Sequence, residues 1–246
     1  MTSALTSVQA LAQPVNDLGG RWMLDPEVLG PCRDAGYPNG YAYYMVGRGG
    51  VLGDVDADVV SSAFGFFAPS LVRTMWERGV VVEGARAAAT RYGAACAAFG
   101  RSRLSGLDGA ARLAELAGRL AGGVDAAGLA LFAGWRAEPL PDDAEGRAYF
   151  LLHVLRELRG SVHLVAVIAS GITPLDAVLA TGGAAAAERF GWQGPFTDVP
   201  TTAKQLAERL TDEMMARLCG AVLTDDELQE LTGLVLAARA HLDAVV

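Results

Sequence analysis

The chain has 246 residues, 52% of them hydrophobic, which is enough to build one large domain or two small ones around a sizeable core. Its formal net charge of −8 opposes binding to the phosphates of DNA, and no run of five basic residues offsets this repulsion. No apolar run reaches the roughly 18 residues of a membrane span, and the N-terminus lacks the basic flank of a secretory signal. Three widely spaced cysteines argue against a disulfide framework and a zinc site, so we expect a reduced, cytoplasmic protein.

The first part of the chain is expected to form short helices that stop at proline and glycine. A helix over 3–13 is predicted to end before Pro14, because proline has no N–H to donate inside a helix. Asp25 is the predicted N-cap of a second short helix that begins at Pro26, since the fixed φ of proline suits the first helical position. The Gly, Pro and Asn residues over 36–40 predict a turn.

A tyrosine-rich segment with several glycines comes next. Tyr41 to Val46 is predicted to be a helical turn or the end of a helix, and the glycines after it are predicted to form a loop. The spacing of these glycines does not fit a dinucleotide-binding loop, and the acidic residues that follow would repel a phosphate. Asp56 is the expected N-cap of an apolar helix over 57–67. Further helices are expected at about 70–78, 80–100, 108–122, 124–136, 173–180, 201–219 and 225–243.

The last two of these helices have amphipathic spacing, with apolar residues three or four positions apart. One stripe consists of Leu206, Leu210, Met214 and Leu218, and the other consists of Leu228, Leu231, Val235 and Ala238. The preceding segment, 181–200, is rich in Gly and Pro. Its aromatic residues are expected to be exposed or to cover another part of the protein; they are Phe190, Trp192 and Phe196.

The segment 146–170 stands out, because it reads as a long buried helix with polar residues on one face. Asp142 or Asp143 is its expected N-cap. At about 100° per residue, five positions share a sector of roughly 120°, and most of the others are apolar. A polar cluster in such surroundings must find partners, because burying an unpaired charge costs several kcal/mol. The five positions are His153, Arg156, Glu157, Gly160 and His163.

This polar cluster is compatible with several kinds of site. His153 and Glu157 lie one turn apart, but no third metal ligand is signalled, so we predict no metal and favour a hydrogen-bond network between helices. His163 and Glu157 are the candidate catalytic residues, because histidine changes its charge near neutral pH. The structural alternative pairs the arginines with Asp176 or with an acid on another helix. Guanidinium groups and phenols suit a pocket for a ligand with a polar head, and the candidate ligand-binding residues are Arg48, Arg156, Arg159, Tyr44 and Trp192.

Two motifs support a resemblance that covers most of the chain. The first is YMVGRGGVLGDV over 44–55, followed by Val59-Val60, Ala63-Phe64, Phe67 and the segment from Pro69 to Val72. The second is LRELRGSVHL over 155–164. Both resemble the actinobacterial helix-turn-helix family, loosely called SalK-like, whose segments read YFxxRxAPLGxVxxxVVxAxFxxFxPxxV and LREHRGDGHVAAL. Two shorter matches are Asp25-Pro26-Glu27, similar to an APE segment, and Gly191-Trp192, similar to a GW.

The resemblance indicates which residues of the polar cluster belong to a family motif and which do not. It makes Arg48 the expected distant partner of the second motif, and it marks Gly160 as a point where another helix or a ligand approaches closely. His153 lies outside the motif. The central His of the family motif is Leu158 here, and its Asp is Ser161.

The chain also departs from the family beyond Trp192. Only about twenty residues separate Trp192 from Thr211-Asp212, which resembles a Thr-Asp landmark, and neither the RGL turn nor the LTxxG element of the family is present. The comparison therefore implies that the C-terminal winged-helix portion is shortened or lost. The best remaining recognition helix, 201–218, mixes basic and acidic side chains and is a poor surface for the major groove.

The expected fold is all-α, a bundle of roughly nine to eleven helices in which helix-turn-helix elements are allowed. We expect an N-terminal helical region over 1–137 and a C-terminal helical region over 138–246, built around the 146–170 helix, folded as one compact unit.

Three functions remain open. The first is a small-molecule-binding protein, with a biosynthetic enzyme of secondary metabolism as one form of it, and an enclosed cavity on the order of a few hundred Å³ near Arg48 and His163. The second, which the family resemblance implies, is a DNA-binding or ligand-responsive transcriptional regulator; it requires a homodimer with half-sites about 34 Å apart. The third is a non-catalytic scaffold. The sequence points to a small-molecule ligand more than to nucleic acid, gives no sign of a membrane partner and identifies no cofactor.

Overall fold

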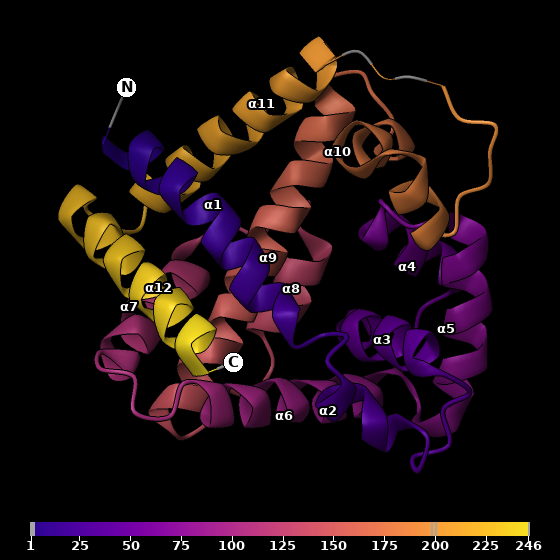
Figure 1. The fold of residues 1–246 in the computed structure, drawn as a ribbon, viewed down its shortest axis with the longest axis horizontal. Coiled ribbons are helices and arrows are strands. Elements are labelled where there is room, and N and C mark those ends of the chain that lie inside the picture. The colour runs from indigo at the N-terminus through magenta and orange to yellow at the C-terminus, as the bar shows by residue number, and fades with distance from the viewer. Residues whose placement is uncertain (1–2, 198, 200, 246) are drawn as a thin grey trace.

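The computed structural model describes residues 3–197, 199 and 201–245, and within these residues the chain is all-α, as predicted (Figure 1). Eleven of the helices in this part of the chain have seven residues or more, and α2 is a single turn. In chain order they are α1 (Ser3–Arg21), α2 (Pro26–Leu29), α3 (Gly40–Gly49), α4 (Ala57–Phe64), α5 (Pro69–Glu83), α6 (Ala85–Arg103), α7 (Ala110–Gly123), α8 (Ala130–Arg136), α9 (Ala144–Ala169), α10 (Pro174–Arg189), α11 (Thr201–Gly220) and α12 (Asp225–Val245). Two short 3-10 turns, Gly30–Cys32 and Gly50–Leu52, follow α2 and α3.

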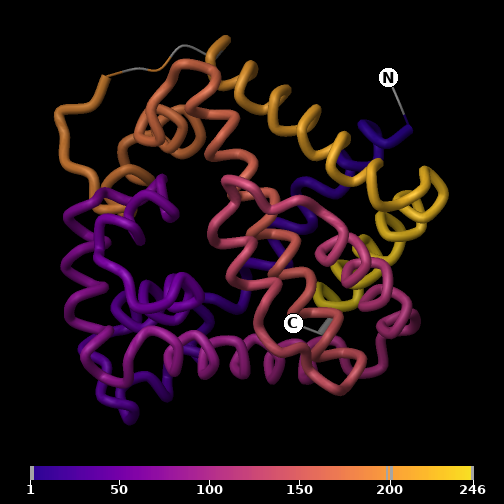
Figure 2. The backbone as a smooth tube through the Cα atoms, turned by 180° about the vertical axis from the view of Figure 1, so that it is seen from behind, coloured from indigo at the N-terminus to yellow at the C-terminus, as the bar shows by residue number. Residues whose placement is uncertain are grey.

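Helix α9 lies at the centre of the molecule, as the apolar 146–170 segment predicted (Figures 1 and 2). It packs against α1, α6, α7, α8 and α11, so it contacts helices from both ends of the chain. Asp143 is its N-cap, and the Asp143 carboxylate accepts a hydrogen bond of 2.7 Å from the backbone N–H of Gly146. The N-terminal α1 and the C-terminal α12 lie side by side, joined by an ion pair of 2.8 Å between Arg21 and Asp243.

Helix α1 continues through Pro14, and the prediction that it ends before this residue is wrong. A proline inside a helix removes one backbone hydrogen bond and costs about 3 kcal/mol. The buried face of α1 includes Val8, Leu11, Val15 and Leu18, on both sides of the proline. Burying each of these side chains contributes about 1.5–3 kcal/mol, so packing outweighs the local preference.

Gly47 and Gly49 lie in α3 and Gly50 lies in the 3-10 turn that follows, so the predicted glycine loop is wrong for these residues; only Gly53, with a φ of +85°, leaves the helical conformation. The reason is the close packing of α3 on α6. A Cβ added to Gly50 would lie 2.0 Å from the carbonyl oxygen of Ala85, and one added to Gly47 would lie 2.6 Å from the ring of Tyr92. Both positions require glycine, because a side chain at Gly50 would clash with the backbone of α6 and one at Gly47 would clash with the buried ring of Tyr92.

Several helix boundaries differ from the expected ones because glycine breaks the regular conformation. The expected helix over 80–100 is divided by Gly84, whose φ of +83° ends α5. Helix α8 begins only at Ala130, after Gly128 with a φ of +76°. Asp56 precedes α4 as predicted, but its side chain makes no capping hydrogen bond. Helix α10 extends to Arg189, beyond the expected end near 180, with a kink at Gly183.

The two C-terminal helices test the predicted apolar stripes. The stripe on α12 is confirmed, since all four of its residues are buried. The stripe on α11 is displaced by one residue, which corresponds to a rotation of about 100°. Leu206 is 37% exposed, whereas the buried side chains are Ala207, Thr211, Met215 and Cys219. Smaller side chains on this face allow α11 to pack on both α1 and α9.

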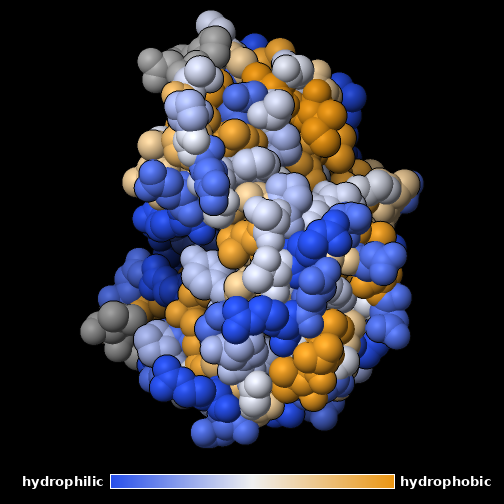
Figure 3. Space-filling view, turned by 90° about the vertical axis from the view of Figure 1, so that its right-hand side faces the viewer, coloured by the Kyte–Doolittle hydropathy of each residue, from blue (hydrophilic) through white to orange (hydrophobic). Residues whose placement is uncertain are grey.

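The surface carries both polar and apolar side chains. On the face shown in Figure 3, hydrophobic residues form several separate clusters that are divided by hydrophilic ones. Among the described residues no single helix has the length and apolar character of a membrane span; α9 and α10, which are bent by 108° relative to each other, meet these criteria only as a pair.

Candidate functional site

A cavity of about 980 Å³ is bounded by α1, α3, α4, α9, α10 and α11. It is larger than the cavity expected from the sequence, and it includes both Arg48 and His163 on its wall. One part of the wall is aromatic and apolar, with Tyr44, Phe64 and Phe67 as its main members. The other part carries charged and polar side chains from α1, α9 and α11. Such a combination of an apolar surface with a few polar groups is typical of small-molecule sites.

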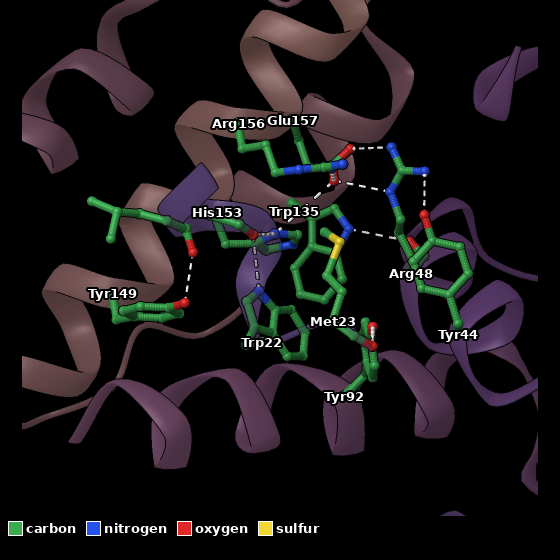
Figure 4. Close-up of polar contacts among 12 residues, drawn as sticks. Trp22, Met23, Tyr44, Arg48, Tyr92, Trp135, Tyr149, His153, Arg156 and Glu157 are labelled. Atoms are coloured by element: carbon green, nitrogen blue, oxygen red, sulfur yellow. Dashed lines mark hydrogen bonds and ion pairs between the residues drawn. The ribbon is translucent and has the colours of Figure 1, made fainter. Parts of the chain in front are cut away.

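Arg48 on α3 and Glu157 on α9 form a buried ion pair beside this cavity (Figure 4). The Nε and Nη2 atoms of Arg48 each donate a hydrogen bond of 2.9 Å to the two carboxylate oxygens. Tyr44 lies one turn before Arg48 on the same helix, and its hydroxyl accepts a 3.1 Å bond from Nη1. The ring of Phe64 lies under the guanidinium, 4.5 Å away. The predicted role of Arg48 as the distant partner of the 155–164 motif is confirmed.

A second arginine makes this cluster positively charged. Nη1 of Arg156 donates a 2.8 Å bond to Oε1 of Glu157, so two guanidinium groups share one carboxylate. Burial alone would raise the pKa of Glu157, but the charges of Arg48 and Arg156 outweigh burial and lower this pKa to about 2. Burial opposes the charged form of Arg48 as well, yet the carboxylate raises the pKa of Arg48 above its ordinary value. The cluster of Arg48, Glu157 and Arg156 therefore has a net charge of +1 at neutral pH.

His153 belongs to the core and not to the cavity wall. Its Nδ1 atom lies 3.3 Å from the carbonyl oxygen of Gly19, and its ring packs edge-on against Trp135 and Trp22. The other ring nitrogen, Nε2, is buried without a hydrogen-bond partner. Burial lowers the pKa of His153 to about 3, although Glu157, 4.0 Å away, acts in the opposite direction. His153 is thus a neutral side chain that helps to pack α9 against α1.

His153 and Glu157 lie one helical turn apart but do not form a metal site. Among the described residues, no group of three or more His, Cys, Asp or Glu side chains is placed to hold a metal ion. The Glu157 carboxylate is occupied by two arginines.

His163 lies on the cavity wall, and its hydrogen bonds define its tautomer. Nδ1 lies 2.9 Å from the hydroxyl oxygen of Thr211 on α11. That hydroxyl donates its single proton to the carbonyl oxygen of Ala207, at 2.7 Å, so it can only accept from the histidine. Nδ1 therefore carries the proton, and Nε2 has a free lone pair 3.9 Å from the Glu208 carboxylate. Burial lowers the pKa of His163 and so favours this neutral form, although the charge of Glu208 acts in the opposite direction.

Arg159 and Gly160 complete the α9 side of the cavity. Nη2 of Arg159 donates a 3.2 Å bond to Glu208, an acid on another helix, as one structural alternative predicted. The other predicted partner, Asp176, instead caps α10 through Thr173. A Cβ added to Gly160 would meet nothing within 4 Å, so this glycine faces open space and not another helix. Of the two predicted alternatives at Gly160, the close approach of another helix is wrong, and the approach of a ligand stays a prediction.

The structure brings most of the candidate site residues together. Arg48, Tyr44, Arg156, Arg159 and His163 all line the cavity. Two candidates do not line it. Glu157 lies behind the wall, fully buried, and Trp192 packs outside it, where its indole N–H donates a 2.8 Å bond to the carbonyl oxygen of Phe66.

Sequence reasoning missed several side chains that shape the site. Lys204 and Glu208 lie at the cavity on α11, and Phe66 stacks on His163 with ring centroids 5.7 Å apart. The buried hydroxyl of Thr211 holds the His163 ring. The spacing of these α11 residues, three or four apart from 204 to 212, was a usable signal, but the neighbouring leucines gave a stronger apolar pattern.

No curated protein and no solved structure matches the chain. The sequence model of one family does match. It covers residues 8–195, which include α1 from Val8 onwards, the α3–α4 motif, all of α9 and the whole of α10. Since the match extends over more than half of the chain, the protein belongs to the helix-turn-helix family.

Proposed function

We propose that this protein binds a small organic molecule in the cavity between α3, α9 and α11. The observation that carries the proposal is the cavity itself, about 980 Å³ in volume, with aromatic side chains on one part of its wall and arginines on another. This volume accommodates a ligand of drug-like size. Protein interiors are normally close-packed, so stability of the fold gives no reason for a space of this size.

The candidate residues have different roles in this proposal. Arg156, Arg159 and Tyr44 contact the ligand, since their side chains line the cavity. Arg48 and Glu157 hold α3 against α9 and so fix the shape of the wall; Glu157 is a positioning residue because two arginines occupy it. Trp192 holds the segment after α10 against Phe66, in the turn that follows α4, and acts only indirectly.

Any chemistry in the cavity is assigned to His163. Its Nε2 lone pair is not taken up by a hydrogen bond, and its ring is fixed by Thr211 and Phe66, so it is placed to accept a proton from a bound molecule. A biosynthetic role in secondary metabolism is the finer form of this proposal. It rests on His163 and on the family resemblance of the 155–164 segment.

Occupancy of the cavity is testable with a fluorescent probe. 8-Anilinonaphthalene-1-sulfonate carries an aromatic body and an anionic group, and its fluorescence rises on binding to an apolar site. We expect saturable binding to the wild type and at least about tenfold weaker binding to Gly160→Leu, because a leucine there occupies the cavity. Gly233→Leu is the control, since Gly233 is also helical and also has open space around an added Cβ, but on α12. Equal binding to all three proteins contradicts the proposal.

A ligand-responsive transcriptional regulator is the second candidate, because the chain belongs to the helix-turn-helix family. The ion pairs of the surface count against a DNA-binding face. Many arginines on α5, α6, α7 and α12 pair with an acidic residue in the described structure; they include Arg73, Arg91, Arg101, Arg112, Arg119 and Arg239. Paired guanidinium groups have less charge to offer to phosphate.

The two candidates differ in a simple measurement. The regulator predicts a dimer and salt-dependent binding to duplex DNA of mixed sequence at about 50 mM salt. Absence of binding under these conditions removes it. The family match ends at residue 195, so α11 and α12 lie beyond it; we take this as support for a shortened C-terminal portion. If neither the probe nor DNA binds, the non-catalytic scaffold is the remaining function.

A further inference from the structure

We infer that the ligand of this cavity is an amphipathic anion: a carboxylate or phosphate monoester attached to an aromatic or aliphatic body. The inference rests on the proposed function, because it names the class of molecule that the cavity binds. Three features of the wall support this assignment: its positive charge, the unused donors of the α9 arginines, and the separation between its polar and apolar parts.

The charge of the cavity wall is opposite to that of the protein. The chain has a formal net charge of −8. The cavity wall nevertheless carries five cationic side chains, Arg48, Arg156, Arg159, Arg189 and Lys204, and only two acidic ones, Glu208 and Asp212. Glu157 behind the wall brings the acids to three, which leaves a net charge of +2 around the cavity. A concentration of positive charge in a cleft of an acidic protein attracts anions.

The α9 arginines retain unused hydrogen-bond donors. Within the described structure, Arg156 donates only through Nη1, to Glu157, and Arg159 donates only through Nη2, to Glu208. The Nε atoms of both arginines are buried without a partner, so a ligand in the cavity does not reach them. The other terminal nitrogens, Nη2 of Arg156 and Nη1 of Arg159, form no hydrogen bond with the described residues and belong to side chains that are 22% and 19% exposed at the cavity wall. These two nitrogens are donors that an oxyanion in the cavity can use.

The position of these arginines points to one binding place. Arg156 and Arg159 are three residues apart on α9 and so lie on the same side of the helix. Gly160 follows them with open space where a side chain would stand. His163 lies one further turn along the wall, with its Nε2 lone pair available to a hydroxyl group of the ligand. Lys204 contributes a second kind of cation from α11, held by the carbonyl oxygen of Ala180 at 3.1 Å.

The apolar part of the wall accounts for the body of the ligand. Phe64 and Phe67 lie near Tyr44 with ring centroids 6.0 and 5.8 Å from its ring, and Phe190 packs on Phe67 at 4.5 Å. These rings line the cavity on the side of α3, α4 and α10. The charged side chains on this part of the wall are Arg48, whose three guanidinium nitrogens are bonded within the protein, and Arg189, next to Phe190. A ligand that uses both parts must have a charged end and an apolar body.

Three probes with one apolar body separate the contributions: 2-naphthoate, 2-naphthyl phosphate and the neutral 2-naphthalenemethanol. Calorimetric titration of the full chain is expected to show that at least one anion binds roughly tenfold or more tightly than the alcohol. The ratio between the two anions then distinguishes a carboxylate ligand from a phosphate ligand.

Arginine variants test where the anion lies. Arg156→Gln and Arg159→Gln are each expected to weaken the anions roughly tenfold and to change the affinity for the alcohol by less than about threefold. Arg112→Gln, which removes an ion pair between α7 and α12, is the matched control and leaves all three affinities unchanged. Circular dichroism of each variant confirms that the helices are retained.

The outcomes distinguish this inference from the proposed function. Equal affinity for the alcohol and both anions, or anion binding that neither arginine variant weakens, overturns the anionic ligand. If Gly160→Leu still abolishes binding of the alcohol in that case, the cavity remains a binding site for neutral molecules. Absence of binding by all three probes at about 1 mM overturns the inference; the fluorescent probe then decides separately whether the cavity binds anything.

Discussion

Arg48 and Glu157 are 109 residues apart in sequence and are joined by two hydrogen bonds of 2.9 Å in the interior of the protein. The Glu157 carboxylate is completely buried, and Arg156 supplies its third bond, at 2.8 Å. This pair fixes α3 against α9 and therefore forms the floor beside the cavity. Loss of the Glu157 charge would leave Arg48, which is buried, without a counter-charge in a place that solvent screens little.

Replacing Glu157 by glutamine should destabilise the protein strongly. The amide has nearly the same shape but leaves two guanidinium groups without a counter-charge, and breaking a buried pair in this way costs about 3–5 kcal/mol. Urea unfolding followed by circular dichroism measures the loss. Glu230→Gln, on the exposed ion pair with Arg112, should cause a much smaller change because solvent screens that pair. Similar losses in both variants would contradict the structural role of Glu157.

Acidification should destabilise the protein from about pH 6.5 downwards through His153. The pKa of this buried imidazole is about 3, against 6.5 in an unfolded chain, so the unfolded state takes up the proton first. The contribution to stability is complete above pH 6.5 and is lost as the pH falls towards 3; at 1.36 kcal/mol per pKa unit it amounts to on the order of 5 kcal/mol.

The variant His153→Phe isolates this contribution. Phenylalanine keeps the aromatic contacts with Trp22 and Trp135, and the carbonyl oxygen of Gly19 still accepts a 3.0 Å bond from the indole of Trp22. Urea midpoints at pH 7.5, 5.5 and 4.5 should fall less in the variant than in the wild type. His163, whose pKa burial also lowers, contributes to the decrease equally in both proteins. Parallel curves would show that His153 does not titrate as described.

Gly50→Ala should destabilise the contact between α3 and α6. The added methyl group would lie 2.0 Å from the carbonyl oxygen of Ala85, so one backbone must move, and overpacking of this kind costs about 1–3 kcal/mol or more. Gly233→Ala on α12 has open space and should instead stabilise the protein by up to about 1 kcal/mol, through the higher helix propensity of alanine. Thermal unfolding of both variants gives the comparison. Equal shifts in the unfolding temperature would argue against the close contact.

His163 should carry its proton on Nδ1 when neutral. Free histidine favours the other tautomer, so nitrogen NMR of the ring at pH 7.5 distinguishes the two, and a proton on Nε2 would contradict the assignment. Thr211→Val removes the acceptor while keeping the side-chain shape. It should cost about 1–3 kcal/mol, because the buried Nδ1–H loses its partner. It should also release the ring, whereas Thr211→Ser, which retains the hydroxyl, should behave like the wild type.

The sequence predicted local structure well where one strong local signal dominates. The central helix, the short helix after Asp25 and the apolar face of α12 were all predicted, and the cap of the central helix was narrowed to Asp142 or Asp143, because capping groups and helical periodicity act within a few residues. Pro14 and Gly50 were misassigned for the opposite reason. Their local preferences are opposed by packing against helices far away in the sequence, which no local pattern reveals.

The candidate site was determined partly by the sequence and partly by the tertiary structure. The sequence alone determined that 146–170 is a buried helix with a polar face, since an apolar helix with charges on one side must find partners. The family motif suggested Arg48, but only the tertiary structure decided that Glu157 is enclosed behind the cavity wall and that His163 faces Thr211. The periodicity of α11 did not predict which of its faces is buried. The helix is rotated by one residue from the predicted orientation, so Ala207 and Thr211 are buried and Leu206 is 37% exposed. The direction in which a helix turns its face depends on the shapes of all its neighbours, and those are brought together only when the chain is folded.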